Sequence, residues 1–155
     1  MERSIVAAAL TDELVQRLSS IRSDAGYPME LRTVLRGRYS ELPEGTPLPA
    51  ACLYTFASEP LAGANAPAGA AKRQRTSQID FWLENKPSEE ELEHWLDRAE
   101  WSIARALVAP AFGRVSGARA LTLGVSIPTP VNPPGEGGGA SMSVQVSLSF
   151  IEKLS

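Results

Sequence analysis

The pattern of apolar and polar residues along the chain predicts two amphipathic helices. Between residues 4 and 23, apolar side chains recur at spacings of three and four, and most charged side chains fall on the opposite side. This is the pattern of a helix that packs one face on a core, and Gly26 is expected to cap its end. The second helix is predicted over 88–108, because Ser88 and Glu91 form a capping box before a continuous apolar stripe.

Strict alternation of apolar and polar residues predicts strands elsewhere in the chain. The expected strands span 29–39, 50–57, 75–85, 121–127 and 142–150. The element order is then α-β-β-β-α-β-β, with a long hairpin joining the second and third strands. It predicts an α+β fold in which two helices cover one face of a largely antiparallel sheet of about five strands.

Two stretches rich in glycine and proline interrupt this pattern, over 59–71 and 128–140. Both contain too few bulky apolar residues to pack, so we expect two long flexible loops. Loops of this length are uncommon in a compact domain, and they are often functional or become ordered against a partner. The length of 155 residues otherwise suits one domain over 1–155.

Charge and cysteine content restrict the function further. Net charge is −3 and the isoelectric point is near 5.2, which argues against bulk electrostatic binding to nucleic acid and predicts no sequence-specific nucleic-acid partner. The apolar run near the N-terminus is too short to span a membrane and is followed at once by acidic residues, so no membrane partner is expected. Cys52 is the single cysteine, so no internal disulfide is possible and a reducing cytoplasm is expected.

The sequence offers little support for catalysis. His94 is the single histidine, and one histidine cannot build a typical zinc site alone. The chain has no Gly-x-Ser-x-Gly elbow and no phosphate- or dinucleotide-binding glycine motif. We therefore expect no enzymatic activity, no catalytic residues, no cofactor and no metal site.

Basic and aromatic residues provide the candidates for a binding surface. Three arginines are expected on one face of the first strand, and further basic residues lie just before the third strand, so neighbouring segments would form a positive patch. Such a patch would contact DNA phosphate or an acidic neighbouring subunit, or would be an ordinary solvated face. Two tryptophans fall outside the apolar stripes and are candidate interface anchors. The basic candidates are Arg32, Arg36, Arg38, Lys72, Arg73 and Arg75, and the aromatic ones are Trp82 and Trp101.

Taken together, the segments of this chain resemble the tail-terminator family of tailed bacteriophages, also called tail-completion or minor tail protein U-like proteins. The likeness runs through the N-terminal helix SIVAAALTDELVQRLSSI, the arginine-rich strand TVLRGRYSELP and the strand LPAACLYTF. It continues through SQIDFWLENK, the acidic start of the second helix, and the closing strands ARALTLGVSIPTP and SMSVQVSLSF. It covers almost the whole chain and depends on element order and pattern rather than on a diagnostic motif.

The resemblance implies a structural virion protein rather than an enzyme. Members of that family form a homohexameric ring that caps the tail tube, ends its polymerisation and offers a joining surface to the head-side neck or connector protein. The implied partners are further copies of the chain, the tail tube protein, the connector protein and, in a contractile tail, the sheath. The implied location is the tail–neck region of the virion, with host cytoplasm as the place of assembly.

Three other interpretations remain open at this stage. The first is a different neck or connector protein of the head–tail junction, which can share the same α+β layout. The second is a small bacterial domain that binds a ligand or catalyses a reaction, which a ligand-induced rise in melting temperature would indicate. The third is a nucleic-acid-binding module, whose affinity would fall steeply with salt.

Overall fold

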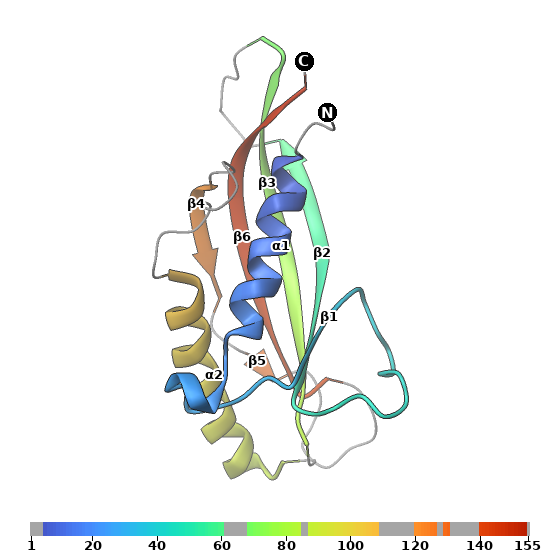
Figure 1. Cartoon of the computed structure of the whole chain (residues 1–155), viewed down its shortest axis with the longest axis vertical. Coiled ribbons are helices and arrows are strands. Elements are labelled where there is room, and N and C mark those ends of the chain that lie inside the picture. Colours follow the sequence, from blue (N-terminus) through green and yellow to red (C-terminus); the bar gives the residue numbers. More distant parts are fainter. Residues whose placement is uncertain are drawn as a thin grey trace.

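The computed structural model describes residues 5–60, 68–84, 87–108, 120–126, 129–130 and 140–154. These described residues form an α+β fold with two α-helices, a short 3-10 helix and one mixed sheet (Figure 1). The elements are α1 (Val6–Ser19), η1 (Ser23–Ala25), β1 (Thr33–Arg36), β2 (Ala50–Pro60), β3 (Ala70–Trp82), α2 (Glu89–Val108), β4 (Ala120–Val125), β5 (Thr129–Pro130) and β6 (Met142–Lys153).

The sheet has the strand order β1-β2-β3-β6-β4, and β5 pairs with β6. All strand pairs are antiparallel except β1 with β2, which is parallel. The predicted α+β fold with a largely antiparallel sheet is therefore confirmed, with one parallel edge strand. That edge strand is also much shorter than the predicted strand 29–39, because Gly37 has a φ of +125° and interrupts the extended backbone.

One face of the sheet carries the main core. Val144 lies in register with Ile79, and Ile79 with Leu53, so apolar side chains from the three central strands share this face. Both helices contribute buried residues to the same cluster, among them Leu14 from α1 and Ile103 from α2. The prediction that both helices cover one face is confirmed, and α1 runs along the length of this face (Figure 1).

The other face of the sheet has no helix over it in the part of the chain that the structure describes. Near β1 the chain segment 37–49 folds over this face, and a small second cluster packs there around Cys52 and Trp82. Further along, the strands present polar side chains to solvent. These are Lys72, Gln74, Thr76 and Gln78 on β3 and Ser143, Gln145 and Ser147 on β6. Antiparallel sheets commonly have one such solvated face.

The predicted flexible loops are partly replaced by strand. β2 continues to Pro60 and β3 begins at Ala70, so the expectation of a loop over 59–71 is wrong at both of its ends. Backbone pairing across the hairpin and with β6 holds these alanines and the proline in extended form. In the second predicted loop, β5 pairs with the start of β6. Residues 61–67, 128 and 131–139 of the two predicted loops lie outside the described residues.

The second helix begins as the sequence predicts. The amide of Glu91 donates to the hydroxyl oxygen of Ser88 at 3.2 Å, which is the serine half of the capping box. Three glutamates occupy the first turn, where the helix dipole favours negative charge. None of the described helices is both long enough and apolar enough to cross a membrane.

Candidate functional site

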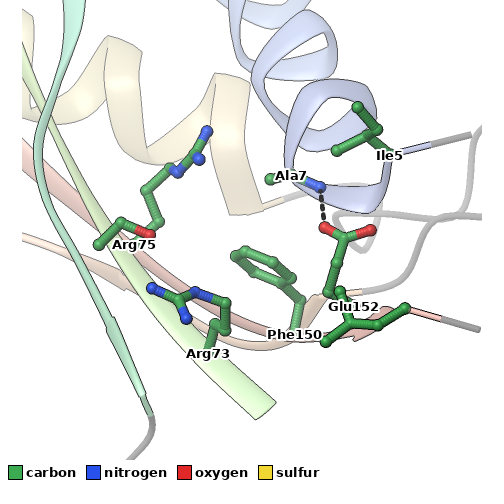
Figure 2. A pocket seen from close by; sticks show the side chains of 8 residues that line it. Ile5, Ala7, Arg73, Arg75, Phe150 and Glu152 are labelled. Atoms are coloured by element: carbon green, nitrogen blue, oxygen red, sulfur yellow. Dashed lines mark hydrogen bonds between the residues drawn. The ribbon is translucent and has the colours of Figure 1, made fainter. Parts of the chain in front are cut away.

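A cavity of about 310 Å³ lies where the N-terminal end of α1 meets the N-terminal end of β3 and the C-terminal end of β6. Its walls combine apolar side chains with charged ones (Figure 2). In register, Arg73 lies opposite Phe150 and Arg75 opposite Leu148. Cross-strand partners share a face, so both arginines are on the helix-covered side of the sheet. The lining residues are Ile5, Ala7, Ser58, Arg73, Arg75, Phe150, Glu152 and Leu154.

Glu152 connects the sheet to the start of α1. Its two carboxylate oxygens accept hydrogen bonds from the amides of Val6 and Ala7, at 2.8 Å and 3.0 Å. Figure 2 shows the carboxylate pointing to the first turn of the helix. The N-cap residue is Ile5, which has no side-chain acceptor, so Glu152 does the work of a capping residue from the other end of the chain. This role of Glu152 was not predicted from the sequence.

The two arginines of the cavity have no such partner. Each of the seven other arginines in the described segments has an acidic, aromatic or carbonyl partner. Within the same segments, Arg73 and Arg75 have neither an ion pair nor a ring contact. Both are half-buried, and the Nε of Arg75 is buried without a hydrogen-bond partner. A buried donor without a partner is unfavourable, and an anion entering the cavity would relieve that penalty.

The charges around the cavity favour an anionic group. Two guanidinium groups and one carboxylate line the cavity, and both oxygens of that carboxylate are already engaged by α1. Guanidinium groups bind carboxylates and phosphates through two parallel hydrogen bonds. The neighbouring Phe150 and Leu154 supply an apolar wall, so the cavity suits an anionic group carried on an apolar stem.

The single positive patch expected from the sequence does not form. Arg36 lies in register with Leu53, which pairs with Ile79, whereas Arg75 is four residues further along β3. That offset is about 13 Å along the strand. Lys72 lies on the polar face of the sheet, opposite to the face of Arg73 and Arg75, because side chains alternate along β3.

The three arginines near β1 also do not share one face, contrary to the prediction. Arg36 reaches the helix side and pairs with Asp12 of α1 at 3.1 Å. Arg38 lies over the ring of Tyr54, 5.7 Å from its centroid, on the opposite side of the sheet. The positive φ of Gly37 between them breaks the alternation on which the prediction depended. Arg32 is exposed, and its guanidinium lies 3.4 Å from Glu84 and its Nε 4.0 Å from Glu30.

The two tryptophans differ in exposure. Trp82 is only 8% exposed and packs with Cys52 and Ala140, so it belongs to the core of the subunit and offers little surface. It does fall outside the main apolar face, as the sequence indicates, but the segment 37–49 covers it. Trp101 is 51% exposed on α2 and makes an edge contact with Tyr27 at 6.1 Å between ring centroids.

The outer surface of α2 is acidic over three turns. At 100° per residue, five acidic side chains fall within roughly 100° of the helix circumference. All five are exposed, and none has an ion pair within the described segments. We call this surface the acidic stripe. It consists of Glu89, Glu90, Glu93, Asp97 and Glu100. His94 is exposed beside it, and no group of three or more potential metal-ligating side chains occurs within the described segments.

Cys52 is a buried structural residue. Burial, together with the smaller effect of the nearby Asp80 carboxylate, raises the pKa of its thiol from 9.0 to about 11. Burial and Asp80 also raise the pKa of Tyr54, whereas Arg38 opposes that rise. A thiol with such a pKa is almost entirely protonated at neutral pH, so it is a poor nucleophile.

No protein-family model matches the chain, and the search of curated proteins finds no match.

Proposed function

We propose that this chain is a structural subunit of a bacteriophage tail that assembles with further copies into a ring. The ring caps the tail tube, ends its growth and presents a joining surface to the head-side neck or connector protein. The sequence resemblance to tail-terminator proteins supports the proposal. The α+β fold with both helices on one face of the sheet is consistent with it.

The observation that carries the proposal is the difference between the surfaces of one subunit. One face of the sheet is covered by helices, and the described part of the other face has a helix-free polar area over β3 and β6. The start of β3 extends beyond the N-terminal end of α1 (Figure 1). A subunit in a ring needs two unlike surfaces to meet its two neighbours, and two further unlike ends to meet different partners.

The mechanism follows from closed symmetry. A ring built through unlike surfaces leaves no unpaired surface once it closes, so it stops at a fixed size. If the free subunits associate weakly, the end of a tube raises their effective concentration and templates closure. The completed ring then offers no position for another layer of tube protein.

The test of this function is the length of tail tubes. Tube protein that polymerises without a terminator gives a broad distribution of lengths, and we expect this chain to stop elongation when it is added to growing tubes. Electron microscopy should show a ring at one end of each stopped tube. Tubes that elongate at an unchanged rate, with bare ends at saturating protein, would contradict the proposal.

The cavity favours a second candidate function, a small anion-binding domain. A volume of about 310 Å³, with two arginines that have no ion pair within the described segments, is at the lower limit of ordinary ligand pockets. A screen of small carboxylates and phosphates by melting temperature tests it directly. A saturable rise that depends on Arg73 and Arg75, without any effect on tubes, would favour this candidate.

A further inference from the structure

The cavity at the N-terminal end of α1 and the acidic stripe on α2 are complementary in charge, and each lacks a partner within the described segments of the chain. We infer that they bind each other between neighbouring copies. A carboxylate of the stripe enters the cavity of the next subunit and pairs with Arg73 and Arg75. This inference rests on the proposed ring and identifies the residues of its repeated contact.

The contact cannot form within one subunit. α1 touches the C-terminal end of α2 through Arg17, whose guanidinium donates to the carbonyl oxygens of Ala106 and Leu107 at 3.3 Å and 3.0 Å. Arg17 lies ten residues beyond the cavity residue Ala7, which is about 15 Å along the helix. The acidic stripe begins at Glu89, at the N-terminal end of α2, and this end lies further from the cavity than the C-terminal end that Arg17 contacts (Figure 1).

The geometry of the two surfaces suits a repeated contact. Each copy has one cavity and one acidic stripe at different places. Every copy can therefore place a carboxylate of its stripe in the cavity of one neighbour and receive a carboxylate from the other neighbour. The two arginines of α2 lie outside the arc of the acidic stripe, where Arg98 stacks on the ring of Trp95 and Arg105 on those of Tyr27 and Trp101. The cavity excludes much of the solvent around Arg75, which strengthens a charged hydrogen bond formed there.

Reversing the charges tests the contact in both directions. The cavity variant carries Arg73→Glu and Arg75→Glu, and the stripe variant carries Glu93→Lys and Asp97→Lys. Each variant alone should self-associate with an affinity about 10-fold or more below that of the wild type, because like charges then face each other across the contact. Sedimentation at low salt measures this affinity. An equimolar mixture of the two variants should associate again, since each reversed surface then meets an opposite charge on the other variant.

Two controls separate this contact from general effects of charge. Lys72→Glu changes the charge beside Arg73 but on the polar face of the sheet, so it should leave association within about 2-fold of wild type. Circular dichroism and urea unfolding of each variant check that it is folded. Free acetate at high concentration should compete with the stripe carboxylate for the cavity and so weaken association of the wild type. It should weaken association of Lys72→Glu to the same extent.

The outcomes distinguish this inference from the proposed function. Restored association in the mixture supports the contact, even if the assembly does not stop tube growth, in which case only the proposed function fails. Rings that form on tubes equally well with the cavity variant would overturn the inference and leave the proposed function standing. The inference is overturned if the mixture of variants stays dissociated under conditions in which the wild type associates. It is also overturned if the wild type is monomeric both in solution at low salt and on tubes. Acetate that binds at the cavity without weakening the association of the wild type would overturn the inference as well.

Discussion

Replacing Glu152 should destabilise the protein although this residue lies at the end of the last strand. Its carboxylate is the acceptor for the first two amides of α1, at 2.8 Å and 3.0 Å, and the helix has no local side-chain cap. Two variants divide the interaction into its parts. Glu152→Gln keeps one oxygen acceptor and removes the charge, and Glu152→Ala removes both.

The expected magnitudes follow from the geometry. Loss of an N-cap acceptor destabilises a protein by about 1 kcal/mol, and a half-buried charge at a helix N-terminus contributes up to about 1–2 kcal/mol. We therefore expect a loss of about 1 kcal/mol in the free energy of unfolding for Glu152→Gln and about 2 kcal/mol for Glu152→Ala. For a domain of this size, each kcal/mol corresponds to roughly 2–4 °C in melting temperature.

Urea unfolding followed by circular dichroism measures these differences. Glu59→Gln is the matched control, because it removes the same charge from an exposed position on β2 that has no ion pair in the described segments. It should change stability by less than about 0.5 kcal/mol. If both Glu152 variants unfold at the same urea concentration as the wild type, the remote cap does not stabilise α1 and the reasoning is refuted.

Three further predictions test the packing. Trp82→Ala should lose about 3–5 kcal/mol of stability in urea unfolding and Trp101→Ala less than about 1.5 kcal/mol, since only the first is buried; equal losses would contradict this assignment. As pH rises from about 9 to 11, unfolded Cys52 loses its proton while the folded thiol, whose pKa is raised to about 11, keeps it. Stability should therefore fall by about 2–3 kcal/mol more in the wild type than in Cys52→Ala. Arg17→Met should lose about 1–3 kcal/mol and speed hydrogen exchange at the C-terminal end of α2, and unchanged exchange there would argue against its role in capping α2.

The parts of the fold that local signals encode were predictable from the sequence. The second helix has a capping serine, three acidic residues in its first turn and an apolar stripe, and all three depend only on neighbours along the chain. The alternation in β6 likewise identifies its buried face. The α+β class and the approximate order of helices and strands along the chain follow from such elements.

The parts that depend on distant contacts were not predictable. The cap of α1 comes from Glu152, 146 residues away from Val6 in sequence. Trp82 is correctly placed outside the main apolar face, yet only the folded segment 37–49 shows that it is covered. The φ of Gly37 separates Arg36 from Arg38, and a sequence pattern cannot reveal it.

The same limit applies to the candidate site. Arg73 and Arg75 were identified as basic residues near the start of a strand, but their position depends on pairing with β6 and on the covering helix α1. Their expected partners near β1 lie elsewhere, because β1 pairs only with the opposite end of β2. What distinguishes the two arginines is the lack of a partner in the described segments, and only the structure shows this.

The most direct test of the central claim is the mass of the assembled protein. Light scattering across a concentration series, with negative-stain imaging of the same samples, should show rings of about six subunits. Subunits that are monomeric alone and close into such rings only on isolated tail tubes would agree equally well. A monomer that ignores tail tubes at every concentration would contradict the account.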